Sequence, residues 1–327
     1  MGPDAVNQIA VVSGGVGAAR FLRGLIDAID DPSTITAVVN TGDDCTLHGL
    51  SISPDLDTIT YTLAGAIDPD RGWGLVGESW RAMESLERFE QVRPEGSAAA
   101  PRWFNLGDRD LATHFYRTAR LAEGASLTTV TDEIRRAWDV PIAIVPMSND
   151  RLSTMVSTRG DDGEITEISF QDYFVRLRHG VEVTGVRFDG AATLSTAARA
   201  ALTHADTVVI APSNPLVSIG PIRTLPDVDE LLSARRDSVV AISPIVGGAA
   251  LKGPADRMLT ELGHEASVVG VARLYAPIAS ILVVDSVDAH LAADVESAGM
   301  RCVVTSTIMS DPDVAAALAR TALASVR

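Results

Sequence analysis

The chain has 327 residues, about twice the size of an average domain, which favours one large α/β domain or two smaller ones and excludes a minimal disulfide-stapled module. Its 27 basic and 43 acidic residues give a formal net charge of −16, which repels a polyphosphate backbone, so no nucleic-acid partner is expected. The two cysteines, Cys45 and Cys302, are too few for a disulfide framework or a thiolate zinc site and are typical of a cytoplasmic protein.

The sequence predicts no membrane partner. Its longest stretch without a charged residue, residues 207–222, contains three prolines, whereas a membrane-crossing helix needs about 20 predominantly apolar residues. The N-terminal part has only a short apolar run from Ile9 and lacks the basic start and long apolar segment of a signal peptide. We therefore expect neither a span nor a signal for export.

Short apolar runs recur along the chain with helical patterns between them. Runs that are apolar on both faces and rich in Val and Ile are typical of buried parallel strands. Seven such runs stand out: Ile9–Val12, Ile35–Val39, Ile142–Val145, Thr207–Ala211, Val239–Ile242, Ile281–Val284 and Cys302–Val304. With helices at Arg109–Glu123 and Val314–Val326, the pattern predicts a doubly wound, mainly parallel, Rossmann-like α/β sheet.

The middle of the chain departs from this alternation of strands and helices. Residues 153–188 alternate in polarity around a turn and then continue through a helical piece into another strand, which predicts an inserted smaller subdomain. We therefore expect core parts at residues 1–152 and 189–327 on either side of the insertion. The stretch Gln91–Pro101, rich in Pro, Gly, Ser and Ala, is predicted to be a surface loop.

The loop after the first strand, Ser13–Arg20, is rich in glycine. Ligands of open α/β sheets bind beyond the carboxyl ends of the strands, and a helix start there presents free amides to an anion. The loop lacks the complete dinucleotide and Walker patterns. It either contacts a phosphate, which we favour, or merely lets the first helix pack on the sheet.

Four carboxylates follow the second strand within fifteen residues: Asp43, Asp44, Asp55 and Asp57. They could be helix caps, but acids held together beside a phosphate repel one another unless a divalent cation intervenes. Hard oxygen ligands favour Mg²⁺ or Ca²⁺. An acid at this distance from a glycine-rich turn also binds the ribose of NAD, although two adjacent acids and a second acidic loop fit that alternative poorly.

Three further loops carry polar or small residues. In the stretch 103–114, Asp108 precedes a helix either as a cap or beside a hydroxyl-rich ligand, with Trp103 or Phe104 available for ring contacts. The stretches 213–222 and 243–248 have proline-fixed backbone and free amides, which suit a nucleotide pressed against the main chain, or are simply tight turns.

Read together and in order, these strings resemble the 2-phospho-L-lactate transferase family (CofD/FbiA). The resemblance spans about residues 13–254. It rests on Ser-Gly-Gly-Val-Gly at 13–17, Asn-Thr-Gly-Asp-Asp at 40–44, Ser-Pro-Asp-Leu-Asp-Thr at 53–58, Asp-Pro-Asp-Arg-Gly-Trp-Gly at 68–74, Leu-Gly-Asp-Arg-Asp-Leu-Ala-Thr-His at 106–114, Pro-Ser-Asn-Pro-Leu-Val-Ser-Ile-Gly-Pro-Ile at 212–222 and Ser-Pro-Ile at 243–245.

The resemblance implies a transferase of coenzyme F-420 biosynthesis. Such an enzyme joins the deazaflavin alcohol Fo to a guanosine-diphosphate-activated three-carbon acid and releases GMP. The acid is lactyl in the archaeal type and enolpyruvyl in the actinobacterial type FbiA, and the arginine-rich composition favours the second. The family also implies a Mg²⁺ cofactor and a homodimer.

The family's functional residues transfer to this chain position by position. Asp43 and Asp57 are expected to be catalytic and to bind Mg²⁺ with Asp44 as a further ligand, and Asp57 to accept the proton of the attacking hydroxyl. The residues expected at Fo are Asp57, Asn105, Asp108 and His114. Those expected at the nucleotide are Gly14, Gly15, Gly17, Ser213, Asn214, Ser218 and Gly220.

Two alternatives stay open at this point. One is a non-catalytic, nucleotide-sugar-binding regulator of the same superfamily, which the acidic loops disfavour. The other is a nicotinamide dehydrogenase. The chain also departs from the family pattern at Asn149, where relatives often carry an acid, and at Asn105.

Overall fold

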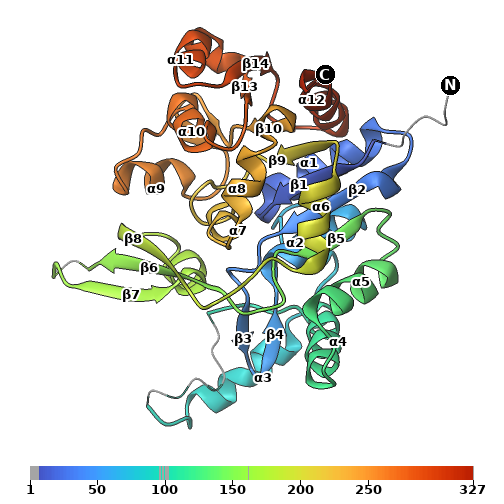
Figure 1. Ribbon diagram of the computed structural model, residues 1–327. Helices are drawn as coiled ribbons and strands as arrows, with labels where there is room; N and C mark the ends of the chain where they lie inside the picture. Colours follow the sequence, from blue (N-terminus) through green and yellow to red (C-terminus); the bar gives the residue numbers. More distant parts are fainter. Residues whose placement is uncertain (1–6, 96, 98, 100–102, 161, 327) are drawn as a thin grey trace.

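A computed structural model describes residues 7–95, 97, 99, 103–160 and 162–326, and its centre is a seven-stranded parallel sheet (Figure 1). The strand order is β14-β13-β10-β9-β1-β2-β5. Each of the seven apolar runs forms one of these strands: β1 (Ile9–Ser13), β2 (Ile35–Val39), β5 (Ala143–Pro146), β9 (Thr207–Ile210), β10 (Val239–Ile242), β13 (Ile281–Asp285) and β14 (Arg301–Thr305). The predicted doubly wound α/β fold is confirmed.

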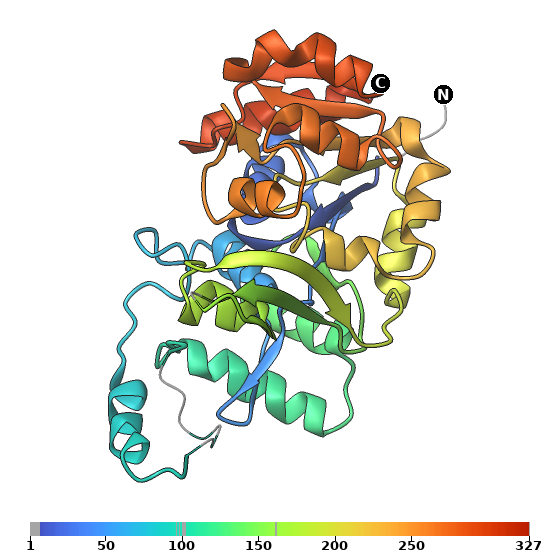
Figure 2. The same cartoon turned by 90° about the vertical axis from the view of Figure 1, so that its left-hand side faces the viewer.

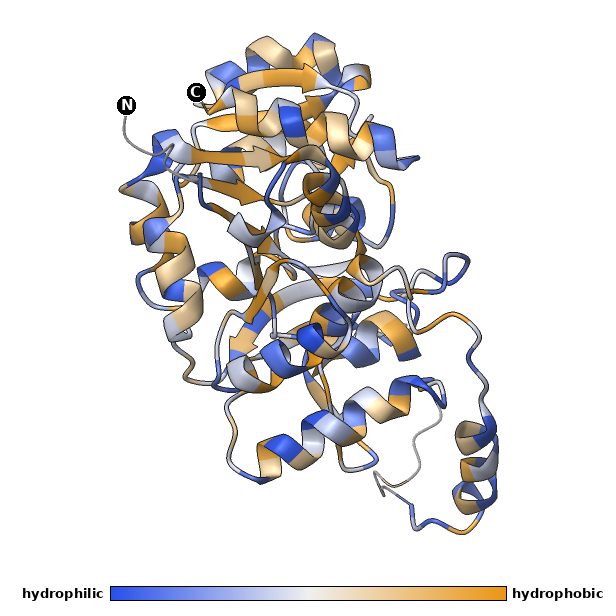
Figure 3. Cartoon of the chain, turned by 90° about the vertical axis from the view of Figure 1, so that its right-hand side faces the viewer, coloured by the Kyte–Doolittle hydropathy of each residue, from blue (hydrophilic) through white to orange (hydrophobic). Residues whose placement is uncertain are grey.

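Helices cover both faces of the sheet because the strands are apolar on both sides. Neighbouring residues of β1 point to opposite faces, so Val11 joins one apolar cluster and Val12 the other. The Val11 face is covered by α1 (Gly15–Ala28), α2 (Pro54–Leu63) and α12 (Pro312–Ser325), with α5 (Leu127–Ala137) packed against β5 at the sheet edge. The hydrophobic strands lie inside this covering, and the helices carry polar residues outward (Figure 3).

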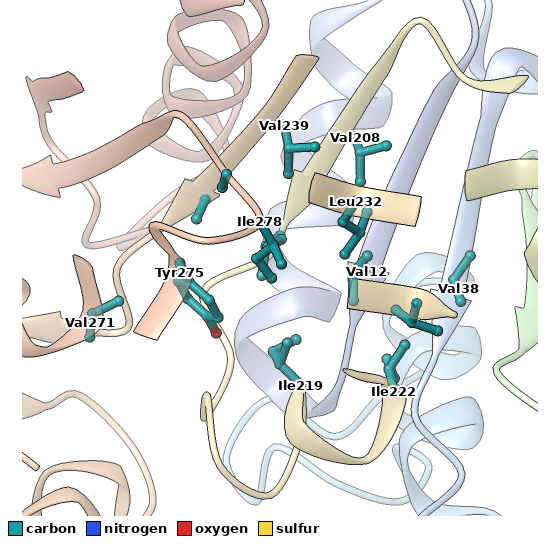
Figure 4. Packing of buried hydrophobic residues seen from close by; sticks show 14 of the residues in the cluster. Val12, Val38, Val208, Ile219, Ile222, Leu232, Val239, Val271, Tyr275 and Ile278 are labelled. Carbon is teal, nitrogen blue, oxygen red and sulfur yellow. The ribbon is translucent and has the colours of Figure 1, made fainter. Parts of the chain in front are cut away.

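The Val12 face is covered by a second set of helices. These are α6 (Thr196–His204), α7 (Gly220–Arg223), α8 (Val228–Ser233), α9 (Ala255–Glu261), α10 (Val268–Tyr275) and α11 (Ala292–Ser297). Figure 4 shows Ile222, Leu232 and Ile278 packed over the strand residues of this face. The short hairpin of β11 (Ile245–Val246) and β12 (Ala249–Ala250) follows β10.

A second lobe projects from the segment between β2 and β5. It consists of the antiparallel pair β3 (Cys45–Leu47) and β4 (Leu50–Ile52), α3 (Arg81–Glu90) and α4 (Asp110–Ala122). The helix predicted at Arg109–Glu123 is α4, whereas the β3–β4 pair was not predicted. Figure 2 shows α3 on an arm that extends away from the sheet. The loop predicted at Gln91–Pro101 follows α3 and lies partly outside the described residues.

The segment with the predicted insertion folds as a three-stranded antiparallel sheet. Its strands are β6 (Ser153–Arg159), β7 (Ile165–Ser169) and β8 (Glu182–Asp189), in the order β7-β6-β8, with a π-helical turn at Asp172–Arg176. Val156 and Tyr173 of the insertion pack against Val217 and Met258 of the main body. No helix in the described part of the chain has both the length and the apolar character that a bilayer crossing requires.

Candidate active site

A cavity of about 650 Å³ opens at the carboxyl edge of the central sheet. The strand order reverses between β1 and β9, and ligands of open α/β sheets bind at such a switch point. The loops after five strands contribute residues to the cavity: Gly14 after β1, Asp43 after β2, Ser213 after β9, Ser243 after β10 and Thr307 after β14. The fold therefore gathers at one edge the loops that the sequence marked as candidates.

The glycine-rich loop brings the start of α1 against the loop after β9. Gly15 has a φ of +69°, which favours glycine, and a Cβ on Gly17 would lie 2.1 Å from the Pro212 carbonyl oxygen. Ser213 Oγ donates a 2.7 Å hydrogen bond to the Gly14 carbonyl. The N-cap residue Gly14 has no side chain to cap α1, and the Gly15 amide is hydrogen-bonded to the Asp55 carboxylate, so the amides after Gly15 are the ones that an anion at this helix start would meet.

Two carboxylates face the cavity from the β2 side. Asp43 is 7% exposed, and the Asn40 Nδ2 atom donates to Asp43 Oδ2 at 3.3 Å and to Asp55 Oδ2 at 3.0 Å. Burial, reinforced by the negative charge of Asp55, raises the pKa of Asp43 well above its ordinary value. Burial also raises the pKa of Asp55 to about 6. The cavity thus contains a pair of acids whose charges are incompletely compensated by the protein.

Asp44 follows Asp43 in the sequence and does not line the cavity. It accepts a 2.7 Å hydrogen bond from Ser53 Oγ, and burial raises its pKa to about 8. The Oδ1 atoms of Asp43 and Asp44 are buried and make no hydrogen bond of standard geometry within the described chain, although the Thr154 hydroxyl is close enough to Asp43 to act on its pKa. Oxygens of this kind fit a divalent cation.

The described residues contain no group of three or more His, Cys, Asp or Glu side chains that could hold a metal by themselves. Mg²⁺ commonly binds through one or two carboxylates together with substrate phosphates. Asp43 and Asp44 therefore fit Mg²⁺ as part of a shell that a phosphate-bearing ligand completes.

Asp57 is placed differently from its expected role. Both of its carboxylate oxygens accept hydrogen bonds from the Arg117 guanidinium, and Asp57 does not line the cavity. His114 is buried beside this pair, with Nδ1 at 3.8 Å from Asp57 Oδ2 and Nε2 at 3.3 Å from Asp110 Oδ2. Neither Asp57 nor His114 lines the cavity in this arrangement.

Two other expected residues also lie away from the cavity. The Asp108 carboxylate accepts hydrogen bonds from Ser79 Oγ and from the first amides of α3, at Arg81 and Ala82. It is therefore a cap, for α3 rather than for the α4 helix that follows it in the sequence. Gly220 begins α7, where a Cβ would lie 3.2 Å from the Phe188 ring. Of the expected site residues, the cavity brings together Gly14, Gly15, Gly17, Asp43, Asn105, Ser213, Asn214 and Ser218.

Aromatic side chains also line the cavity. Trp103 and Phe104, considered for ring contacts from the sequence, line the cavity beside Asn105. Phe170 and Phe174 of the insertion line it as well and stack with ring centroids 5.5 Å apart. Sequence analysis missed these two, although their spacing of four on a helical piece was a readable signal.

The cationic residues of the cavity wall were also missed. They are Arg20, Arg71 and Lys252, which is the only lysine of the chain. Arg71 is ion-paired with Asp68 at 3.0 Å, and its guanidinium lies 5.5 Å from the ring centroid of Trp73, which lines the cavity too. The string at 68–74 contributed to the family resemblance, but the sequence did not predict that this loop lies at the cavity.

The chain is similar to a family of known proteins. The family model described as 2-phospho-L-lactate transferase CofD matches residues 9–318. Proteins named phosphoenolpyruvate transferase are 42% identical in Streptomyces griseus over 319 residues, covering 97% of both chains, and 40% identical in Kitasatospora aureofaciens over 320 residues, again covering 97% of both. The Mycolicibacterium smegmatis protein of the same name is 39% identical and covers 97% of this chain and 98% of its own.

The fold also resembles that of a solved structure. A crystal structure of a UPF0052 family member from Bacillus halodurans aligns with a TM-score of 0.59 at 15% identity, covering 98% of this chain and 100% of that one. At this identity the similarity supports the fold alone.

Proposed function

Because the chain belongs to the 2-phospho-L-lactate transferase (CofD) family, a family of coenzyme F-420 biosynthesis, we propose that it transfers a phosphoenolpyruvyl group from a guanosine-diphosphate-activated donor to the ribityl hydroxyl of Fo. The products are dehydro-F-420-0 and GMP. The enolpyruvyl donor is favoured over the lactyl one because the similar actinobacterial proteins are named phosphoenolpyruvate transferase.

The observation that carries this proposal is the composition of one cavity. The start of α1, two buried acids and several aromatic side chains line the same space of about 650 Å³. A donor with a diphosphate and an acceptor with a flat ring system need these three features together.

The donor fits the side of the cavity formed by β1 and β9. We place its diphosphate at the start of α1, near Gly15 and Gly17, and its guanosine along Asn214 and Ser218. The deazaflavin ring of Fo fits the aromatic wall of Trp103, Phe104, Phe170 and Phe174, beside Asn105.

The reaction is a displacement at phosphorus. The Fo hydroxyl oxygen forms a new P–O bond to the phosphorus that carries the three-carbon acid, while the bond to the bridging oxygen breaks and GMP leaves with that oxygen. The hydroxyl proton passes to a carboxylate of the cavity wall, for which Asp43 and Asp55 are positioned. Asp57 stays a predicted catalytic residue and metal ligand, and in this structure both of its oxygens accept hydrogen bonds from Arg117.

Magnesium is proposed as the cofactor on the basis of the buried Oδ1 atoms of Asp43 and Asp44. When bound, Mg²⁺ would neutralise charge on the transferred phosphoryl group. Asp43 and Asp44 would hold it on the protein side.

A mass-spectrometric endpoint assay tests the proposal. Purified protein and Fo with Mg²⁺ are offered the enolpyruvyl and the lactyl guanosine diphosphates separately, and each reaction is repeated with a chelator. We expect metal-dependent dehydro-F-420-0 from the enolpyruvyl donor. Product from the lactyl donor alone would assign the archaeal reaction, and no product from either would support the non-catalytic, nucleotide-binding alternative.

The expected homodimer and cytoplasmic location stay predictions. Sedimentation velocity of the purified chain measures the first, and fractionation of the producing cells measures the second.

A further inference from the structure

Lys252 is the only lysine of the chain, and it lines the active-site cavity together with Arg20 and Arg71. Arg71 is already engaged, because its guanidinium pairs with Asp68 at 3.0 Å and donates to the Leu75 carbonyl at 2.9 Å. The Lys252 ammonium has neither an ion pair nor a hydrogen bond with any residue that the structure describes. It is therefore a cation available to a ligand of the cavity.

The position of the Lys252 ammonium associates it with the aromatic residues of the cavity. A Cβ on Gly72 would lie 3.2 Å from Lys252 Nζ, so the ammonium rests against the backbone of the residue before Trp73. The next residue along the chain, Gly253, borders the insertion, because a Cβ there would lie 3.9 Å from the Phe174 ring. Lys252 therefore lies between two segments that supply aromatic side chains to the cavity.

Most charged groups of the segments around Lys252 are paired within their own segments. These pairs are Asp68–Arg71 in the loop at 68–74, Asp172–Arg176 in the insertion and Arg257–Glu261 in α9, at 3.0, 2.6 and 2.9 Å. The other acids of these segments, Asp70 and Asp256, do not line the cavity. The acids that do line it, Asp43 and Asp55, form no ion pair with Lys252. The positive charge of Lys252 is therefore not neutralised by the protein around it.

The proposed acceptor carries a group that such a cation would bind. The ring system of Fo has a phenolic hydroxyl, apart from the ribityl hydroxyl that reacts. Loss of the phenolic proton leaves a negative charge that the electron-poor ring delocalises, which makes this group more acidic than an ordinary phenol. An opposite charge within about 4–6 Å stabilises such an anion. With the ribityl hydroxyl at the acids and the ring on the aromatic wall, the ring oxygen comes to the part of the cavity where Lys252 lies.

The carboxylate of the donor is a second oxyanion that a lysine could bind. The donor is placed along the start of α1 and the loop after β9, whereas the segments that flank Lys252 carry aromatic residues placed at Fo. The acceptor is therefore the favoured partner. Lysine, a point charge on a flexible stem, suits a single oxygen atom of this kind.

We propose that Lys252 is a specificity-determining residue of the acceptor site, which binds the phenolate oxygen of Fo and thereby selects the deprotonated form of the ring. The inference rests on the proposed function and deepens it on the acceptor side. Lys252 does not touch the transferred group, so its contribution falls on the binding of Fo rather than on the transfer step.

Visible absorption of bound Fo tests the proposal without any donor, because the ring spectrum changes when the phenol loses its proton. The spectrum is titrated with pH for free Fo and for Fo bound to the wild type, Lys252→Met and Lys252→Arg. In the wild type, we expect the phenol pKa to lie about one pH unit below that of free Fo, as a nearby opposite charge dictates. Lys252→Arg should keep this lowering, and Lys252→Met should abolish it.

The same contact predicts a pH-dependent affinity for Fo. A pKa lowered by about one pH unit strengthens binding about 10-fold above the pKa of free Fo, and not at all below the lowered pKa. Fluorescence titration should therefore show about 10-fold weaker binding of Fo by Lys252→Met on the alkaline side and equal binding on the acid side. The donor KM should stay unchanged.

Arg20→Met is the matched control, since Arg20 is a cation of the same cavity that belongs to α1, where the donor is placed. It should leave the pKa of bound Fo as in the wild type. Wild-type protein that binds Fo with the pKa of free Fo, or equal effects of Arg20→Met and Lys252→Met, would overturn the proposal. A Lys252→Met variant that raises the donor KM alone would also overturn it and would assign Lys252 to the donor carboxylate.

The outcomes separate this inference from the proposed function. Fo that binds with a lowered pKa while neither donor yields product would support the acceptor contact and contradict the transfer reaction. Product formed by a wild type that leaves the pKa of Fo unchanged would do the reverse, and a wild type that does not bind Fo at any pH would contradict both. Because the Lys252 side chain is exposed, its variants are expected to fold, and their melting temperatures check this.

Discussion

Asp43 combines three properties that single it out among the acids. It lines the cavity, it is buried, and its Oδ1 atom makes no hydrogen bond of standard geometry in the described chain. Its neighbour Asp44 also has such an oxygen but not the position on the cavity wall. Chemistry at this site should therefore depend most directly on Asp43.

Asp43→Asn should lower kcat by about 100-fold or more, because the neutral amide removes charge next to the reacting phosphorus. The same change should weaken Mg²⁺ binding, which calorimetry in the presence of GDP measures without turnover. Asp31→Asn is the control, since Asp31 only caps an exposed turn. A kcat of Asp43→Asn equal to that of the wild type would show that Asp43 has no catalytic role.

The buried acids also predict how stability depends on pH. The pKa of Asp44 is raised from 3.8 to about 8 and that of Asp55 from 3.8 to about 6. Between pH 4 and these values the folded chain keeps protons that the unfolded chain has released. The free energy of unfolding contributed by these groups therefore decreases as pH rises through this window.

Urea unfolding in a chelator at pH 5 and pH 8 measures this effect, and the chain should be more stable at pH 5. Added Mg²⁺ should stabilise it more at pH 8, because a metal ligand must be deprotonated. Metal-free stability that rises from pH 5 to pH 8 would contradict the prediction.

Among the elements, α1 and α12 pack unusually closely. A Cβ on Gly24 of α1 would lie 2.4 Å from the backbone carbon of Ala315 in α12. Alanine is the better helix former by about 1 kcal/mol, so intrinsic preference alone predicts that Gly24→Ala stabilises α1. The clash should outweigh that preference.

We expect Gly24→Ala to lower the free energy of unfolding by about 1–3 kcal/mol, as overpacked cores do. Gly185→Ala is the control, because a Cβ there meets Ser157 at an ordinary 3.6 Å. Urea denaturation measures both variants. A Gly24→Ala chain as stable as the wild type would mean that α12 shifts freely to make room.

The secondary-structure elements differ in how well they could be predicted from the sequence. All seven strands of the central sheet were predicted, because strands buried on both faces are written as continuous apolar runs. The three-residue strands β3 and β4 are too short to leave such a pattern. The rule that ligands bind beyond the carboxyl ends of the strands located Asp43. The local sequence could not show that Asp57 is placed differently, because its partner Arg117 lies 60 residues further along the chain.

On the scale of the whole molecule, the active site is assembled from distant segments. The sheet contributes the phosphate and acid loops, and the insertion contributes Phe170 and Phe174. Sequence analysis predicted the insertion but not these ring contacts, because they depend on how the three-stranded sheet folds back over the main body. The packing of Val156 and Tyr173 on Val217 fixes that arrangement.

Phe174→Ala should raise KM for Fo by about 2- to 10-fold, the range that corresponds to one aromatic contact. KM for the donor should stay unchanged, because the donor fits the other side of the cavity. Phe89→Ala is the control, since Phe89 is 59% exposed on the α3 arm and does not line the cavity. Steady-state kinetics with each substrate varied in turn distinguishes the two variants. Equal effects on both KM values would contradict the separate placement of acceptor and donor.

The solitary lysine makes the molecule convenient for chemical labelling. Lys252 is exposed on the cavity wall and is the only lysine of the sequence, and the arginines carry no amine that amine-reactive esters would modify. A fluorophore coupled to that one side-chain amine would sit at the cavity mouth without any engineered cysteine. Shielding of the amine by a bound substrate would then report occupancy as a slower labelling rate.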